Sequence, residues 1–212
     1  MPFDYKKEYK EFYLPPKKPT LVDVPAMNFV AVRGKGDPND PDGDYQRALN
    51  VLYSVAYTLK MSYMGARDID GFFQYVVPPL EGFWFDVDEK GVDLSQKGKF
   101  EWLSAIRLPD FVKQDDFRWA VETASEKKKF DCSAAQFVMI DEGLCAQCMH
   151  IGSYDSETRT LELIRQFVEE QGLTFDFSET RLHHEIYLSD PRKTAQEKLK
   201  TVLRTPVKKI NE

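Results

Sequence analysis

The chain has 212 residues, a net charge of -6 at pH 7 and a sequence pI near 5.3. Its content of 42% hydrophobic and 13% aromatic residues is that of a folded globular protein. The acidic balance offers no basic surface for a polyphosphate chain, so we do not expect a nucleic acid partner. No run of about 18 apolar residues and no N-terminal apolar region occur, which predicts a cytoplasmic protein with no membrane partner.

The first half of the chain begins with a lead-in segment, residues 1–19, which is interrupted by prolines and is expected to pack as an extended strand. We expect a single domain over 20–208. A strand is predicted over 27–36, and a helix begins at Asp44, where apolar residues recur at helical spacing: Tyr45, Leu49, Leu52, Ala56 and Leu59. Further strands are predicted at 71–77, 82–87 and 99–108.

The second half begins with a predicted helix near 115–128, followed by a hairpin over 135–152 that turns at Asp141, Glu142 and Gly143. A second amphipathic helix is capped by Asp155 or Ser156 and ends at Gly172. Two strand-like runs close the chain, "HHEIYLSDP" from His183 and "LKTVLRTPV" from Leu199.

The order of these elements is the same in both halves, namely a strand, a helix and two more strands. One such unit cannot bury its apolar surface alone, so two should pair. The predicted fold class is therefore α+β, with two pseudo-symmetric strand-helix-strand-strand modules of the tandem SHS2 type. A central cleft between the modules is the expected ligand site.

Cys145 and Cys148 form a CxxC pattern with His150 just beyond it. Residues three apart in a strand point to opposite faces, so both sulfurs cannot easily reach one metal ion. We interpret them as buried small hydrophobic residues, and a metal or redox role is the alternative. No cofactor and no metal are expected.

Aromatic residues supply most of the candidate ligand-binding side chains. Six rings are singled out, although core packing would also account for each of them: Trp84, Phe83, Tyr75, Tyr53, Tyr57 and Trp102. Trp84 follows a Pro-Pro break in "EGFWF", where two neighbouring rings point to opposite faces of a strand.

Glu185 is the candidate catalytic residue. Strand alternation places it on one face with His183 and Tyr187, and places His184, Ile186 and Leu188 on the other face, which is apolar enough to contact a core. Glu185 is either a solvated carboxylate or the acidic floor of an aromatic cleft. In the second case it would bind a cation or act as a general base, Tyr187 would assist it, and His183 would line the site.

The stretch "VPPLEGFWF…FEWLSAIRLPDFV", the repeated halves and above all "HHEIYLSDPRKTAQEKLKTVLRTPV" resemble the GyrI-like small-molecule-binding family. The resemblance covers roughly residues 20–207. It implies a two-module fold with an aromatic cleft and an acidic residue at the position of Glu185. Regulators in this family carry a DNA-binding region ahead of the module, where this chain has about 20 residues, so DNA binding is not expected here.

Three functions follow from the resemblance as hypotheses. The chain resembles stand-alone members that bind planar hydrophobic or cationic xenobiotics and hydrolyse cyclopropanoid DNA-alkylating drugs, with Glu185 activating a water. The second hypothesis is a sequestering or sensor module without turnover. The third is an interaction protein that inhibits gyrase, which would have to affect supercoiling by purified gyrase.

Overall fold

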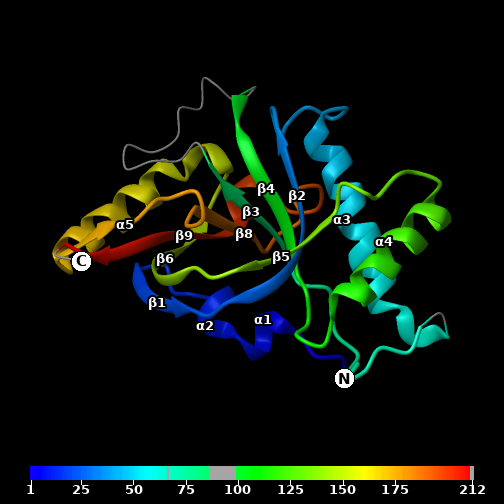
Figure 1. Ribbon diagram of the computed structural model, residues 1–212. Coiled ribbons are helices and arrows are strands. Elements are labelled where there is room, and N and C mark those ends of the chain that lie inside the picture. The colour runs from blue at the N-terminus through cyan, green and yellow to red at the C-terminus, as the bar shows by residue number, and fades with distance from the viewer. Residues whose placement is uncertain (66, 86–98, 211–212) are drawn as a thin grey trace.

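The computed structural model describes residues 1–65, 67–85 and 99–210. Its centre is an antiparallel sheet with the strand order β1-β6-β9-β8-β3-β4-β2-β5, and β7 pairs with the end of β9 (Figure 1). The strands are β1 Thr20–Val24, β2 Met27–Lys35, β3 Leu80–Trp84, β4 Glu101–Arg107, β5 Gln136–Ile140, β6 Gly143–Ile151, β7 Leu173–Phe175, β8 His183–Tyr187 and β9 Lys200–Lys209. The helices are α1 Tyr5–Glu8, α2 Lys10–Tyr13, α3 Asp44–Lys60, α4 Gln114–Lys128 and α5 Thr158–Glu170, with short 3-10 turns η1 Ser62–Met64, η3 Tyr154–Ser156 and η4 Gln196–Lys198. The α+β class is confirmed.

The connectivity brings corresponding strands of the two halves together. The first half supplies β2, α3, β3 and β4, and the second supplies β6, α5, β8 and β9. The halves meet where β3 pairs with β8, and β4 and β9 each lie one strand further out. Glu185 therefore lies on a strand at the junction of the halves, near the middle of the sheet.

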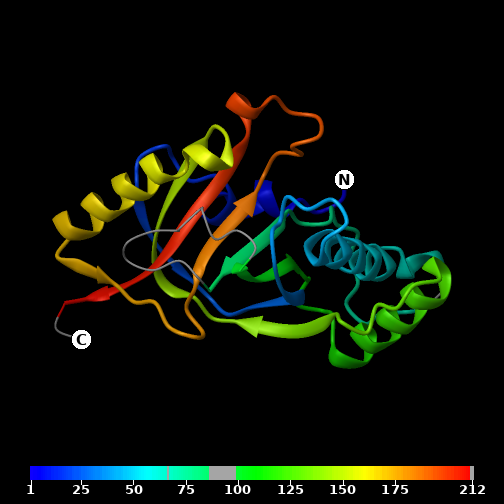
Figure 2. The ribbon, with the colours of Figure 1, turned by 90° about the horizontal axis from the view of Figure 1, so that it is seen from above.

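Helices α3 and α5 cover the same face of the sheet. Residues that pair across neighbouring strands point to one face, and the pairs connect Val32, Ser104, Gly82, Glu185, Leu203 and Cys148 in one row. Val32 packs in the core under α3, and Cys148 and Leu203 pack under α5. We call this side the helix face; in Figure 2, β8 and β9 run between the two helices.

The N-terminal segment covers the opposite face, which we call the N-terminal face. The prediction of an extended strand over 1–19 is wrong, because this segment folds into the one-turn helices α1 and α2. Tyr5, Phe12 and Tyr13 are buried in a core that includes Phe83 and Ile186 of the sheet. Burial of these rings is the physical reason for the compact form.

The predicted hairpin over 135–152 is also wrong. β5 and β6 follow one another in nearly the same direction: β5 pairs with β2, and β6 pairs with β1. The register is continuous across the break, since Met27 pairs with Ile140 and Val24 with Gly143. The polar residues between β5 and β6 do not reverse the chain, because Glu142 is buried in ionic contacts.

The predicted strand over 71–77 does not form. Only Tyr75 makes an isolated bridge, to Phe3, and its ring contacts the rings of Tyr5, Phe72, Phe73 and Phe111. These aromatic residues favour packing under the N-terminal segment over pairing in the sheet. The next strand begins at Leu80, and the end of the predicted 82–87 strand lies outside the described residues.

The predicted helices are confirmed within a few residues. The apolar residues of α3 form a stripe that packs on the sheet and against α4. Within the described ranges, no helix is both long and apolar enough to cross a membrane.

Candidate functional site

Glu185 is held by two neighbours on its own strand. The hydroxyl of Tyr187 donates a hydrogen bond of 2.8 Å to Oε2 of Glu185, and Nε2 of His183 lies 3.5 Å from Oε1. The three side chains share a face because strand residues two apart point the same way. The side chain of Glu185 is 12% exposed, so its carboxylate is fixed in position and still reaches solvent.

Tyr187 remains a neutral phenol. Burial, followed by the negative charge of Glu185, raises the pKa of Tyr187 well above its usual value. Its ring meets the ring of Tyr154 edge to face, with 5.8 Å between the centroids. Tyr187 therefore connects Glu185 with η3, the turn that leads into α5.

A second carboxyl group, Glu157, lies at the start of α5. Burial raises the pKa of Glu157 well above its usual value, and the negative charge of Glu185 raises it further. The Thr201 hydroxyl offsets part of this rise. Glu157 therefore keeps its proton to a higher pH than an ordinary glutamate.

Tyr45 approaches the same group from α3. Burial raises the pKa of Tyr45 well above its usual value; the hydroxyls of Ser104 and Tyr187 oppose this rise, and Glu185 adds to it. Tyr45 also packs edge to face on Trp102, with 5.0 Å between the centroids. Tyrosines from α3, η3 and β8 thus lie within electrostatic range of Glu185.

Trp84 completes the group on the β3 side. A Cβ atom on Gly82 would lie 2.9 Å from the Tyr187 hydroxyl oxygen and 3.2 Å from Nε1 of Trp84. Gly82 is therefore the residue that lets both polar atoms approach the sheet next to Glu185. Nε1 of Trp84 is buried and has no hydrogen-bond partner among the described residues.

The other predicted ligand-binding residues have different surroundings, and some are buried while others are exposed. Trp102 is buried against Gly34, where a Cβ atom would come within 2.2 Å of its ring. Tyr53 and Tyr57 lie on the exposed side of α3. Burial raises the pKa of Tyr53; Tyr57 and Asp190 add to the rise and Arg192 opposes it, the last two from the loop after β8. Tyr53 thus faces that loop.

Phe83 and Tyr75 belong to the N-terminal face. Phe83 stacks on His184 with 3.9 Å between ring centroids and an interplanar angle of 19°. Tyr75 is 1% exposed and packs with Phe83 in the core under the N-terminal segment. The expectation that they line one site with Glu185 is therefore corrected: alternation along β3 points Phe83 away from its neighbour Trp84.

His183 does not line the site as expected, because its side chain is 1% exposed. The sequence also gave little indication of four residues near Glu185. From the sequence, Tyr45 is interpreted as a core residue, Tyr154 as part of a turn and Glu157 as the start of a helix. Ser104 lies within a predicted strand. Only strand pairing, which a single sequence does not reveal, brings Ser104 beside Gly82.

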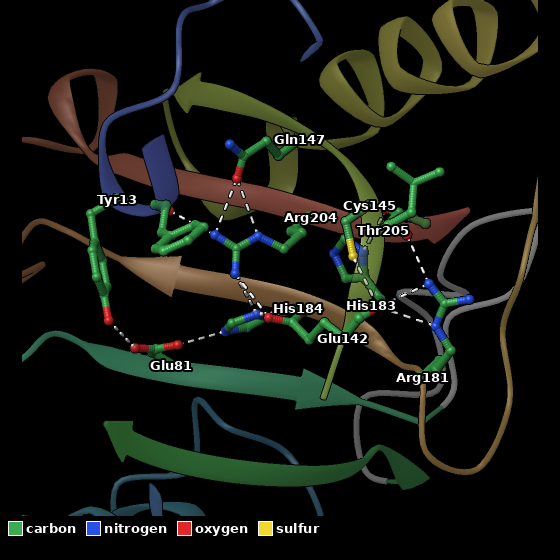
Figure 3. Close-up of polar contacts among 12 residues, drawn as sticks. Tyr13, Glu81, Glu142, Cys145, Gln147, Arg181, His183, His184, Arg204 and Thr205 are labelled. Atoms are coloured by element: carbon green, nitrogen blue, oxygen red, sulfur yellow. Dashed lines mark hydrogen bonds and ion pairs between the residues drawn. The ribbon is translucent and has the colours of Figure 1, made fainter. Parts of the chain in front are cut away.

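The N-terminal face carries a buried ionic network directly behind the site (Figure 3). His184 lies between two carboxylates, with Nε2 2.9 Å from Glu81 and Nδ1 2.9 Å from Glu142. Arg204 Nη1 lies 2.9 Å from the other oxygen of Glu142. Two carboxylates thus face two cationic groups, and charges balance when His184 is protonated. The expectation that the face of His184, Ile186 and Leu188 contacts a core is confirmed, and this core also contains the ionic network around His184.

The paired charges of the network shift the pKa values of Glu142 and His184. Burial disfavours the ionised form of Glu142, but His184 and Arg204 outweigh it and lower the pKa of Glu142 to about 2. Burial likewise disfavours the charged form of His184, but Glu142 and Glu81 outweigh it and raise its pKa. His184 therefore keeps its positive charge to a higher pH than an ordinary histidine.

The network also binds the N-terminal segment. Arg204 donates a hydrogen bond of 2.7 Å to the Phe12 carbonyl, and Tyr13 donates one of 3.3 Å to Glu81. Gln147 accepts from Arg204 and donates to the Glu11 carbonyl at 2.6 Å. These contacts make the network structural, since every charged member already has protein partners.

The three cysteines are free and buried. Burial raises the pKa of Cys148 to about 11, and burial together with the charge of Glu142 raises the pKa of Cys145 to about 12. Such thiols are poor nucleophiles at neutral pH. Among the described residues, no group of three side chains is arranged to hold a metal ion.

The model of the GyrI-like small-molecule-binding domain matches residues 17–208, and the chain therefore belongs to this family. No functionally curated protein matches the chain.

Solved structures agree with this assignment. A hydrolase from Listeria innocua is 46% identical with a TM-score of 0.88, and the match covers 97% of this chain and 100% of that one. An uncharacterized conserved protein from Listeria innocua is 47% identical with a TM-score of 0.90, at the same coverage. The C-terminal domain of EcmrR shares the fold alone, with 14% identity, a TM-score of 0.57 and coverage of 91% and 98%.

Proposed function

We propose that the protein binds planar hydrophobic or cationic small molecules at Glu185 and hydrolyses strained electrophiles of the cyclopropanoid class. The observation that carries this proposal is the Glu185 carboxyl group, partly exposed and held on one oxygen by Tyr187, near Glu157, whose pKa is raised. The family's small-molecule binding and the hydrolase names of two Listeria innocua structures support it.

Binding would rest on the aromatic rings around Glu185. Trp84, Tyr45 and Tyr154 come from three different elements; Trp84 and Tyr45 are partly buried and Tyr154 is exposed. A planar ligand of about 25 non-hydrogen atoms gains about 0.3 kcal/mol per atom, which gives roughly micromolar affinity. The negative charge of Glu185 would add attraction for a cation.

Hydrolysis would use Glu185 as a general base. The carboxylate accepts a proton from a water whose oxygen forms a bond to a cyclopropane carbon. The strained carbon–carbon bond breaks, and its electron pair moves into the conjugated ring system to a carbonyl oxygen. That oxygen then takes up one proton, so the product is the substrate plus one water.

Neighbouring acidic groups would hold the base in place and would supply the proton that the carbonyl oxygen takes up. Tyr187 keeps its proton because its pKa is raised, so its hydroxyl group continues to donate to Oε2 of Glu185 and holds the base in place. Glu157, whose pKa is also raised by burial and by the charge of Glu185, would supply the proton that the carbonyl oxygen takes up. Opening such a ring would inactivate a DNA-alkylating drug, from which we infer a role in detoxification and drug resistance.

The experiment is incubation of purified protein with a spirocyclopropyl cyclohexadienone, followed by mass spectrometry for the gain of one water. Glu185→Gln should reduce the rate by about 10²- to 10⁴-fold, the usual value of positioned base catalysis. Glu179→Gln removes an exposed carboxylate from the preceding loop and should leave the rate unchanged. No gain of water with the wild-type protein would exclude the hydrolase function.

Binding without turnover is the second candidate, because the matching family model describes a small-molecule-binding domain. In that case the protein would retain the intact compound through gel filtration, and Trp84→Ala would weaken retention. Binding to nucleic acid would shift the mobility of DNA mixed with the purified protein, and inhibition of gyrase would change supercoiling by the purified enzyme. We expect neither result.

A further inference from the structure

Two histidines follow one another in β8, and the mechanism above uses neither. His184 belongs to the ionic network of the N-terminal face. His183 points to the helix face, where it pairs with Trp84 of β3 and its ring contacts Thr205 of β9. At 1% exposure, His183 is out of reach of a ligand.

The imidazole of His183 makes one contact with each ring nitrogen. Nδ1 lies 3.3 Å from the Thr205 hydroxyl oxygen, and Nε2 lies 3.5 Å from Oε1 of Glu185. Thr205 is itself 3% exposed. A buried hydroxyl, a buried imidazole and a partly exposed carboxylate thus form a line that ends at the candidate base.

The chemistry of these groups assigns the hydrogen atoms. A carboxylate oxygen only accepts hydrogen bonds, so Nε2 must carry hydrogen for the contact with Glu185 to be attractive. Nδ1 can then accept from Thr205, whose hydroxyl is able to donate. Thr205 therefore favours the tautomer that points a hydrogen at Glu185, in the way that a second partner fixes the orientation of a functional histidine.

We infer that His183, itself fixed by Thr205, is a positioning residue that holds Oε1 of Glu185 while Tyr187 holds Oε2. This inference rests on the proposed function, in which Glu185 is the base. The two contacts fix the carboxylate plane and leave its remaining lone pairs toward the exposed side. A base fixed in this way needs no reorientation before it accepts a proton from water.

The kinetic experiment uses Thr205, which is separated from the ligand by His183. Thr205→Val removes the hydroxyl group at nearly constant volume, and we expect kcat for a spirocyclopropyl cyclohexadienone to fall by about 10-fold or more while KM stays unchanged. Thr205→Ser restores the hydroxyl and should restore kcat. A rise in KM with unchanged kcat, or failure of Thr205→Ser to rescue, would overturn the inference.

His183→Gln supplies the second arm of a double-mutant cycle. If Thr205 acts through His183, adding Thr205→Val to His183→Gln should lower kcat no further. Independent, multiplying effects of the two changes would contradict this. Urea midpoints of all variants show that the comparison is made on folded protein.

A spectroscopic measurement keeps the inference separate from turnover. Nitrogen-15 NMR of the histidine rings in the ligand-free protein should show hydrogen on Nε2 of His183, whether or not the protein is a hydrolase. A neutral ring with hydrogen on Nδ1 alone would leave a lone pair facing Glu185 and would overturn the positioning role. Failure of the proposed function would instead appear as the correct tautomer in a protein that adds no water.

Discussion

Nδ1 of His184 lies 2.9 Å from Oε2 of Glu142, and neither side chain is more than 8% exposed. The pKa of His184 is raised from 6.5, so its contribution to stability is complete below pH 6.5 and is lost as pH rises through the folded-state pKa. Glu142 behaves in the opposite way: its contribution is present above pH 4.5 and is lost as pH falls toward about 2.

We therefore expect the network to be most stabilising between about pH 4.5 and 6.5, where both pairs are charged. The measurement is the free energy of unfolding in urea from pH 5 to 9, for the wild type and for His184→Gln. The difference between the two proteins should be larger at pH 6 than at pH 9. A difference that is independent of pH would contradict the assignment of a charged His184.

Removing one charge from the network should destabilise the protein strongly. Glu142→Gln leaves Arg204 and His184 facing Glu81 alone, and breaking a buried pair in this way costs about 3 to 5 kcal/mol. Asp44→Asn removes the partner of Arg47 in an exposed pair on α3 and should cost less than about 1 kcal/mol. Equal losses for the two variants would show that burial does not decide the strength of these pairs.

The N-terminal segment should stabilise the sheet through Tyr13. Its hydroxyl donates to the buried Glu81, so Tyr13→Phe should cost about 1 to 3 kcal/mol, the range for leaving a buried charged acceptor with one partner fewer. Tyr63→Phe, at a tyrosine that is 49% exposed, is the matched control and should change the unfolding midpoint little. A Tyr13→Phe protein as stable as the control would exclude this role.

Sequence reasoning reached the face of Glu185 and Tyr187 because alternation along one strand is a local property. It did not predict the ionic network on the opposite face of the sheet. Glu142 and Arg204 are 62 residues apart, and a glutamate between Asp141 and Gly143 has the composition of an exposed turn. Whether a charged residue is buried depends on partners from other strands, so His184 looked no different from an ordinary core position.

In the candidate site too, local patterns predict the elements but not which of their residues come together. The apolar stripe that predicted α3 also contains Tyr45, whose ring is in fact beside Tyr187. Glu157 was indistinguishable from the other acidic residues at the start of α5. Its proximity to Glu185 follows from the packing of α5 over β6 and β9, which a single sequence does not encode in any local pattern.

Glu157 should lower stability at high pH. Its folded-state pKa is raised, so between pH 4.5 and that pKa the folded protein keeps a proton that the unfolded chain has released, and stability falls as pH rises. Glu157→Gln keeps the shape of the protonated side chain and cannot ionise. We expect the variant to gain stability over the wild type at pH 8 compared with pH 4, in thermal unfolding measured at both values.

Glu169→Gln, at an exposed position on the same helix, controls for the change of side chain. If Glu157→Gln changed the stability by the same amount at pH 4 and pH 8, the pKa of Glu157 would be the same in the folded and unfolded protein. The assignment of an acid beside the base would then be lost.

Gly82 should be required for activity more than for stability. In a strand, alanine normally stabilises relative to glycine, because glycine loses more conformational freedom on folding. Here the added Cβ atom would come within 2.9 Å of the Tyr187 hydroxyl oxygen and 3.2 Å of Nε1 of Trp84. Both are the ends of side chains that can move aside, so the expected effect of Gly82→Ala is displacement of Tyr187 from Glu185.

A displaced Tyr187 would release Oε2 of Glu185, and a misplacement of about 1 Å can cost about 100-fold in rate. Gly34→Ala is the informative comparison, because its Cβ atom would meet the body of the buried Trp102 ring at 2.2 Å and the core would have to shift. We expect Gly34→Ala to lower the unfolding midpoint, and Gly82→Ala to lower hydrolysis of the cyclohexadienone with a smaller change in midpoint. If Gly82→Ala retained full activity, the contact between Tyr187 and Glu185 would not be needed for catalysis.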